Sequence, residues 1–342
     1  RKPEYRQKTI CLSQEPPEKM QERWEKDERD PQLLAVYDIW FDEEDRLEEY
    51  RIIGDSQTAE GEKWYLYRMT NPLSGWYNGY TYLDTMNPEA VDEFINITYE
   101  TYKRELGSEF GNNIPAIFTD EPNYGIINMK AYARDGQDAE FPWTQSFREA
   151  FRDRFGYDIL EYIPELIWNR KGDMPSTARY HYYAHASEML ASSYNDRIGK
   201  WCQRNGIAFT GHVLMEDSLY SQMVAVGEAM RQYKEYTLPG IDILCNERQF
   251  ATAKQAQSVS HQCGREGMTS ELYGVTGWEF DFRGHKFQGD WQAALGVTFR
   301  VPHLAWVSMQ GSAKRDYPAS IGYQSSWFRE YGFIEDHFAR VN

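Results

Sequence analysis

An α/β fold organised as a (β/α)8 barrel of the TIM type is the architecture that this sequence predicts. From residue 82 onward, short apolar strands alternate with polar loops and helical stretches, and six such units follow one another in regular order. A chain of 342 residues suits one barrel domain. Hydrophobic residues make up 41% and charged residues 26%, which are values typical of globular domains.

The region before the regular units divides into two parts. Residues 1–32 are polar and show no sustained periodicity, so we expect a surface lead-in. Residues 33–79 contain two β-prone segments, 33–41 and 63–70, separated by an acidic link. These segments form either a hairpin-like insertion or the first barrel strands. We prefer the hairpin, which leaves the barrel (80–342) incomplete at its N-terminus, with two strands upstream of Arg1.

The six units follow from patterns of hydrophobicity and from helix-boundary residues. The predicted strands are 80–83, 114–119, 207–214, 240–244, 268–272 and 303–309. The predicted helices are 88–105, pieces of 143–204 broken near Gly156 and Pro175, then 218–233, 251–265, 289–299 and 327–340. Asn87 followed by Pro88 starts the first of them, because proline is favoured at the first helical position. We expect Asp290 to cap the helix at 289–299.

Charge and composition exclude several classes of function. A formal net charge of −16 repels phosphate backbones and anionic lipid, so nucleic acid is not an expected partner. No apolar run has the length of a membrane span, and residues 1–9 are too polar for a signal peptide, which favours the cytoplasm slightly over secretion but leaves localisation open. The four cysteines show no metal or disulfide spacing and are expected as free thiols.

Polar residues that close apolar strands are the candidate site, because barrel enzymes place their chemistry at the carboxyl ends of the strands. The six strand ends offer, in chain order, Asp84; Asp120 and Glu121; His212 and Glu216; Asp242; Glu271 and Tyr273; and His303 and Trp306. Glu121 precedes Pro122, which favours an extended backbone at that position. Glycosidic hydrolysis needs one proton donor and one carboxylate that attacks or activates water, and Glu121 and Glu271 form such a pair.

The remaining candidates are residues that would bind a sugar. Aromatic residues make up 15% of the chain, and aromatic faces stack on sugar rings. The candidate platforms are Tyr273, Trp278, Trp306 and Tyr323, and the candidate hydroxyl ligands are Asp84, Asp120, His212, Glu216 and His303. Each has an ordinary structural alternative: aromatic side chains commonly pack in a core, a histidine can be buried with its hydrogen bonds satisfied, and an aspartate can cap a turn.

With 303–309 counted as strand eight, Glu121 ends strand four and Glu271 ends strand seven. The sequence here resembles the clan A TIM-barrel glycosidases, in which these positions hold the acid/base and the nucleophile. The motifs Trp76-Tyr-Asn-Gly, Tyr82-Leu-Asp-Thr-Met-Asn-Pro-Glu-Ala, Phe118-Thr-Asp-Glu-Pro and Ser270-Glu-Leu-Tyr-Gly resemble bacterial α-L-rhamnosidases of glycoside hydrolase family 106. Asp120 stands where the clan has Asn, so an inverting mechanism stays open beside a retaining one.

Three functions are compatible with these residues. The first is a glycoside hydrolase acting on an oligo- or polysaccharide. The second is a carbohydrate-binding barrel that has lost hydrolysis, and the third is a metal-dependent hydrolase that uses His212 and His303. No nucleotide-binding or HExxH motif is present, so no cofactor is expected, although the resemblance allows calcium. The expected partner is a carbohydrate; the resemblance adds β-sandwich domains, and a homo-oligomer stays open.

Overall fold

The computed structural model of the chain describes residues 2–125, 137–172, 174–308, 310 and 319–341. They form two compact units, each built on a five-stranded sheet. Unit 1 comprises Arg1–Arg104, Asn123–Arg197 and Tyr220–Arg231, and unit 2 comprises Glu105–Pro122, Ile198–Leu219 and Gln232–Asn342. These bounds differ from the predicted division at residues 32 and 79.

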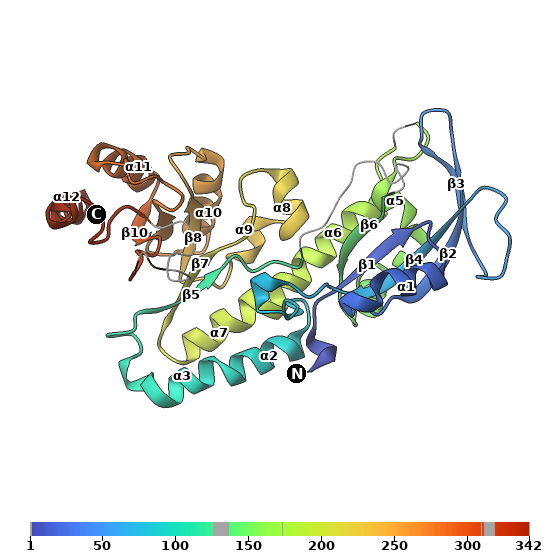
Figure 1. Cartoon of the computed structure of the whole chain (residues 1–342), viewed down its shortest axis with the longest axis horizontal. Coiled ribbons are helices and arrows are strands. Elements are labelled where there is room, and N and C mark those ends of the chain that lie inside the picture. The colour runs from blue at the N-terminus through green and yellow to red at the C-terminus, as the bar shows by residue number, and fades with distance from the viewer. Residues whose placement is uncertain (1, 126–136, 173, 309, 311–318, 342) are drawn as a thin grey trace. The chain divides into compact units, whose positions relative to one another are not determined.

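Unit 1 contains an antiparallel sheet (Figure 1). Its order is β3-β2-β4-β1-β6, and the strands are β1 (Lys8–Ser13), β2 (Gln32–Phe41), β3 (Leu47–Ile53), β4 (Glu62–Thr70) and β6 (Ala139–Trp143). The predicted strands at 33–41 and 63–70 are therefore confirmed as β2 and β4, which pair with each other. The acidic link does not close a hairpin between them, because it leads into β3, the outer neighbour of β2.

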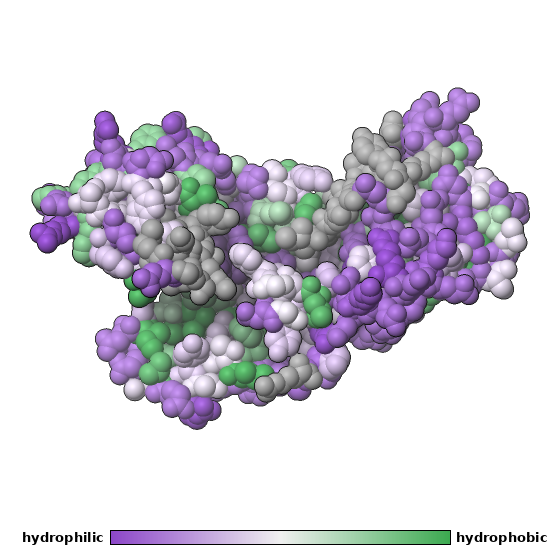
Figure 2. Space-filling model, in the orientation of Figure 1, coloured by the Kyte–Doolittle hydropathy of each residue, from purple (hydrophilic) through white to green (hydrophobic). Residues whose placement is uncertain are grey.

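Strand β1 lies inside the segment that the sequence indicated as a surface lead-in. All six of its residues are buried, because β1 pairs with β4 on one side and β6 on the other. Cys11 belongs to a core cluster with Val36 and Tyr67, and Met20 of helix α1 (Pro17–Trp24) packs into it. Three consecutive apolar residues, Ile10 to Leu12, within a polar stretch are too short a signal to reveal a central strand. Figure 2 shows mostly hydrophilic residues on the visible surface of this part of unit 1, at the right of the view.

The helices of unit 1 follow the boundary residues that the sequence offers. Asn87 caps α2 with its side-chain oxygen, which accepts hydrogen bonds from the N–H groups of Glu89 and Ala90. Gly156, in the left-handed conformation at φ +79°, ends α4, as the predicted break requires. The helices are α2 (Pro88–Ile97), α3 (Tyr99–Leu106), α4 (Phe147–Phe155), α5 (Pro164–Ile167), α6 (Thr177–Leu190), α8 (Leu219–Ala225) and α9 (Ala229–Gln232); a π-helical turn, Ala191–Asn195, joins α6 to α7 (Asp196–Arg204).

Unit 2 contains a parallel sheet of order β10-β9-β8-β7-β5. Its strands are β5 (Ala116–Asp120), β7 (Ala208–His212), β8 (Leu238–Ile243), β9 (Met268–Leu272) and β10 (Val297–Pro302). Helices α10 (Phe250–Gln262) and α11 (Phe282–Ala294) pack against β8, β9 and β10, and α12 (Gly332–Val341) packs on α11. The apolar patterns at 114–119, 207–214, 240–244 and 268–272 thus predicted four strands at the right places.

The last predicted unit is misplaced. Helix α11 begins after Asp281, whose side chain accepts from the N–H groups of Arg283 and Gly284, so Asp290 is not its cap. The helix, Phe282–Ala294, begins and ends earlier than the predicted helix at 289–299. The last strand is Val297–Pro302 instead of 303–309. Of the predicted strand, Met309 lies outside the described residues. An Asp beside Trp291 gave a local cap signal as strong as that of Asp281.

The predicted (β/α)8 barrel is wrong. Among the described residues the parallel sheet has five strands and stays open, with β5 and β10 at its edges, so the fold is α/β with a half-barrel sheet. Residues 80–83 make only isolated bridges, Ser74 with Tyr80 and Arg6 with Leu83, and add no parallel strand. The two early segments are committed to the antiparallel sheet. Five β/α units therefore replace the six predicted from Tyr82 onward.

Candidate active site

The carboxyl edge of the parallel sheet in unit 2 collects the polar residues that close its strands. Asp120 and His212 are register partners on β5 and β7, and Asp242 and Glu271 are register partners on β8 and β9. Register partners on parallel strands project to the same face, which is why residues up to 151 positions apart meet here. Glu121 directly follows β5 and Glu271 lies in β9, and two strands, β7 and β8, lie between β5 and β9 in the sheet.

Glycines allow strands β5, β7 and β8 to lie close together. A Cβ atom on Gly211 would lie 1.9 Å from the carbonyl oxygen of Thr119, and one on Gly240 would lie 2.3 Å from that of Gly211. No side chain fits at such distances, so the residue before His212 has to be glycine. This contact sets the spacing of the strands that hold Asp120 and His212.

The chain turns sharply as it leaves four of the strands. Glu121, Met215, Cys245 and Tyr273 have φ values of +48°, +57°, +57° and +72°. Non-glycine residues rarely adopt this left-handed conformation, and where they do they concentrate at functional sites. The extended backbone predicted for Glu121 is therefore wrong: Pro122 excludes the right-handed helical region, but the turn away from the sheet edge requires a positive φ. The N–H of Glu121 still donates to the carbonyl of His212, at 3.2 Å.

His212 stands at the centre of this cluster, with a side chain only 1% exposed. Its Nε2 lies 3.1 Å from Oδ1 of Asp120 and 3.8 Å from Oδ2 of Asp242. Its Nδ1 lies 3.9 Å from Oε2 of Glu271, whose other oxygen lies 3.8 Å from Nε2 of His303. Acceptors thus flank both nitrogens of the ring. We name Asp120, Glu121, His212, Asp242 and Glu271 the carboxylate cluster.

Glu216 supports the cluster from the interior. It is 6% exposed, and its two oxygens accept hydrogen bonds from the hydroxyl of Tyr233 at 2.6 Å and the backbone N–H of Asp242 at 2.8 Å. Burial raises the pKa of Glu216 to about 7, although His212 and these hydrogen bonds oppose the rise. The side chain that the sequence indicated as a sugar ligand therefore holds β8 and Tyr233 in place.

Electrostatics in the cluster are dominated by one imidazole among several carboxylates. Burial lowers the pKa of His212, but Asp120 and the neighbouring carboxylates more than offset burial and raise it to about 9. At neutral pH the ring is therefore an imidazolium. Its contact with Asp120 lowers the pKa of that exposed carboxyl, which lies 75% open to solvent.

The two candidate catalytic carboxyls, Glu121 and Glu271, both have raised pKa values. Burial raises the pKa of Glu121, with His212 opposing and Asp120 adding to the rise. Burial also raises the pKa of Glu271, and Glu121 contributes to that rise, so the two carboxyls interact electrostatically. For Asp242, burial raises the pKa to about 6. A partly buried carboxyl with a raised pKa is the state that suits a general acid.

Other predicted residues lie in different surroundings. Asp84 belongs to unit 1 and is fully buried; its Oδ2 accepts from Thr144 at 2.8 Å and pairs with Lys8 at 3.4 Å, and burial raises its pKa to about 6. Tyr273 is also fully buried, in a core cluster with Leu272 and Ala319, and no ring face is open for stacking. In this structure the carboxylate of Asp84 makes internal contacts with Thr144 and Lys8, and the ring of Tyr273 packs in the core. A sugar contact at either residue stays a prediction.

Three aromatic candidates remain accessible. Trp278, 39% exposed, meets Trp306 edge to face with ring centroids 5.8 Å apart. Tyr323 is 62% exposed, and its hydroxyl donates to the carbonyl of Val307 at 2.8 Å. These rings lie in the loops of unit 2 that follow β9 and β10, so they stay candidate platforms.

Two residues of the site escaped selection from sequence. Asp242 was recognised as a strand end but not chosen, because a single Asp inside an apolar Gly-Ile-Asp-Ile-Leu pattern resembles a turn residue as much as a ligand. Tyr233, which bonds Glu216, lies after helix α9 and carries no local signal. Asp242 is identified only by its strand register with Glu271, and Tyr233 only by its hydrogen bond to Glu216.

The cluster also offers two sets of three possible metal ligands, Asp120 with His212 and Glu271, and Glu121 with His212 and Asp242. The ligand atoms of each set lie within 4.8 Å of one another.

Two further expectations concern membrane spans and cysteines. Within the part of the chain that the structure describes, no helix is long and apolar enough to cross a bilayer. All four cysteines are free, as predicted; Cys11 and Cys202 are buried, and Cys263 is exposed.

The chain is similar to proteins that are named as glycosidases. The chain is 21% identical over 265 residues to a protein of Formosa agariphila described as a "Putative beta-glucuronidase", covering 75% of this chain and 21% of that protein. Its fold matches a rhamnosidase structure from Novosphingobium sp. PP1Y with a TM-score of 0.61 at 18% identity, covering 86% of this chain and 30% of that one. The chain thus spans less than a third of either relative, and both have the names of glycosidases. No family model matches the sequence.

Proposed function

We propose that this chain provides the catalytic carboxylates of a glycoside hydrolase, with Glu121 as the general acid and Glu271 as the nucleophile or base. The observation on which the proposal rests is that both side chains, 150 residues apart, are half-buried at one sheet edge around the buried imidazole of His212. The two glycosidase-named relatives support the same class of reaction.

In this mechanism Glu121 protonates the leaving oxygen of the glycosidic bond. Burial favours its protonated form, and Asp120 and Asp242 add to that preference. Glu271 then either attacks the anomeric carbon or removes a proton from an attacking water, the two routes of retention and inversion. The His212 imidazolium, 3.9 Å from Glu271, stabilises the ionised form of that carboxyl in a crowded acidic site.

The carboxylate cluster also fits calcium through its oxygen atoms, which are the ligands that this ion prefers. Asp120 and Glu271 would hold the ion in one set, and Glu121 and Asp242 in the other, while the protonated His212 that is common to both sets would not ligate it. A bound calcium would bind sugar hydroxyls and offset the acidic charge. The residues above perform the proton transfers of the proposal without it.

Single amide variants test the assignment. We expect Glu121→Gln and Glu271→Gln each to lower kcat on an aryl glycoside, such as p-nitrophenyl α-L-rhamnoside or β-D-glucuronide, by roughly 10²- to 10⁴-fold. Glu266→Gln is the matched control, because Glu266 is exposed and precedes β9 at the opposite end of the strand that holds Glu271. Full activity in both test variants would refute the assignment.

The open sheet favours one alternative, a carbohydrate-binding module without hydrolysis. A five-stranded sheet gives a shallower site than a closed barrel, and the chain spans 30% of the rhamnosidase structure. Saturable sugar binding without release of nitrophenol from either glycoside would select this alternative over hydrolysis.

A further inference from the structure

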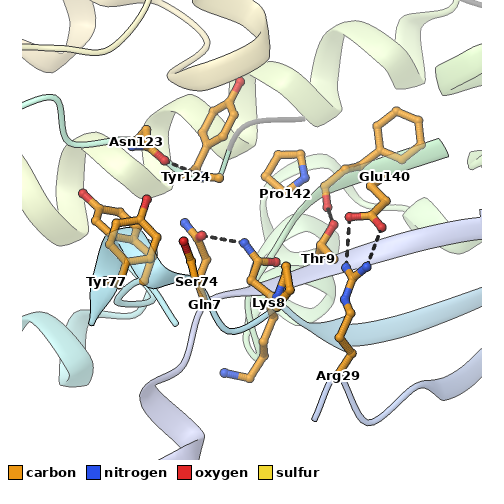
Figure 3. Close-up of a pocket in the computed structure, with 15 residues that line it drawn as sticks. Gln7, Lys8, Thr9, Arg29, Ser74, Tyr77, Asn123, Tyr124, Glu140 and Pro142 are labelled. Atoms are coloured by element: carbon orange, nitrogen blue, oxygen red, sulfur yellow. Dashed lines mark hydrogen bonds and ion pairs between the residues drawn. The ribbon is translucent and has the colours of Figure 1, made fainter. Parts of the chain in front are cut away.

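Unit 1 contains a cavity of about 260 Å³ that none of the residues of the carboxylate cluster lines (Figure 3). Its walls come from the start of β1, from the loop after β4, from residues 123–125 and from β6. Pockets for drug-sized ligands begin at roughly 300 Å³. The cavity therefore suits one small ring and not an oligomer.

The cations that line the cavity are already paired. Arg29, 3% exposed, forms two hydrogen bonds with the carboxylate of Glu140, at 2.9 and 3.0 Å. The amino group of Lys8 donates to the carbonyls of Glu4 and Arg6, at 2.7 and 2.8 Å, and turns away from the amides of the cavity (Figure 3). With both positive charges satisfied by protein groups, the cavity offers little to a phosphate or carboxylate ligand.

One polar group in the cavity lacks a partner. Gln7 is 2% exposed, and its Oε1 accepts a hydrogen bond from Nδ2 of Asn71 at 2.6 Å. Its Nε2 is buried and has no hydrogen-bond partner among the described residues. A buried donor without a partner is unfavourable, so a ligand with an acceptor oxygen would remove that penalty. Gly125 lies over this amide pair, where a Cβ would be 3.3 Å from Gln7.

An aromatic pair supplies the apolar part of the wall. The rings of Tyr77 and Tyr82 are half-buried, with centroids 5.2 Å apart and planes inclined by 34°. Tyrosine presents an apolar face together with a polar hydroxyl, the combination that matches the C–H face and the hydroxyls of a pyranose. Neutral amides, tyrosines and satisfied charges together describe a site for an uncharged, hydroxyl-rich ring.

We propose that this cavity is a second carbohydrate site that binds a single neutral monosaccharide ring. A sugar oxygen accepts the hydrogen bond from Nε2 of Gln7, and one face of the ring lies against Tyr77 and Tyr82. The site goes beyond the proposed hydrolysis, because binding here requires neither Glu121 nor Glu271.

Calorimetric titration tests the proposal, with L-rhamnose and D-glucose as neutral probes and D-glucuronate as the charged probe. We expect at least one neutral sugar to bind with a Kd on the order of 1 mM and D-glucuronate to bind at least tenfold more weakly. Tyr77→Ala should weaken binding at least tenfold, because it removes the aromatic wall. Tyr80→Ala is the matched control: Tyr80 is 66% exposed, does not line the cavity, and should leave Kd within twofold.

A second variant addresses the unpartnered amide. Gln7→Leu keeps the approximate volume and removes the donor, so we expect binding at least fivefold weaker; far-UV circular dichroism checks that the buried substitution folds. The Glu121→Gln/Glu271→Gln double variant should bind the neutral sugar as tightly as the unmodified chain does. Loss of hydrolysis and loss of this binding are thus separate results.

Three outcomes would overturn the inference. No saturable binding of either neutral sugar would mean that water alone fills the cavity. Equal or tighter binding of D-glucuronate would contradict its neutral character. Binding that survives Tyr77→Ala but disappears in the Glu121→Gln/Glu271→Gln variant would place the sugar at the carboxylate cluster, which would remove this second site and leave the proposed hydrolysis standing.

Discussion

Replacement of His212 by Gln should remove a pH-dependent part of the stability of unit 2. The pKa of His212 is about 9 in the folded chain and 6.5 when unperturbed. A raised pKa means that folding favours the protonated ring, so the stabilisation is full below pH 6.5 and is lost as the pH rises through 9. The difference of about 2.5 pKa units corresponds to about 3 kcal/mol. Unmodified protein should therefore lose about this amount relative to His212→Gln between pH 6 and pH 10.

Urea denaturation at several pH values measures this difference, and NMR titration of the imidazole protons measures the pKa itself. His261→Gln is the matched control, because His261 is exposed on α10 and its loss should leave the pH dependence unchanged. If His212 titrates at or below pH 6.5, or if the two proteins respond to pH in parallel, the carboxylates do not stabilise an imidazolium and the electrostatic account of the cluster is wrong.

Further predictions concern the strand contact, acid stability and the rate profile. Gly211→Ala should destabilise the fold by about 3 kcal/mol or more, because its Cβ would lie 1.9 Å from the oxygen of Thr119; thermal unfolding measures the loss, and Gly332→Ala, with open space around it, should change little. His185 is buried among phenylalanine rings, and burial lowers its pKa to about 4, so its stabilisation is full above pH 6.5 and falls by about 3 kcal/mol as the pH drops through 4; His185→Leu should flatten that acid limb in urea denaturation. If Glu121 is the general acid, kcat falls as the pH rises through its raised pKa, and a pH–rate profile of Glu121→Gln should lack this alkaline limb; a limb that persists would exclude the role.

The local order of the chain was readable from its residues. An apolar run followed by Asp-Glu predicted a strand with a polar end, and β9 has the bounds that the pattern Met-Thr-Ser-Glu-Leu indicated. Asn87 before Pro88 predicted the start of α2, and Gly156 the end of α4. These signals are correct because a capping side chain, a left-handed glycine and a short apolar strand act over a few residues.

Which strands pair was decided only by tertiary structure. The segments at 33–41 and 63–70 have the same β-prone pattern whether they belong to a barrel or to a separate antiparallel sheet, and the partner that decides between these, β1, is hidden in a polar stretch. For the same reason Tyr273 looked like a surface platform and proved to be buried.

The sequence by itself determined that Glu121 and Glu271 end apolar strands in a parallel α/β arrangement. Tertiary structure alone decided that Asp242 joins them, that Glu216 supports them from beneath, and that His212 is charged in their midst. The physical reason is one of range: hydrogen bonding within a turn depends on neighbouring residues, whereas register, burial and the pKa of a group depend on segments of the chain that only folding brings together.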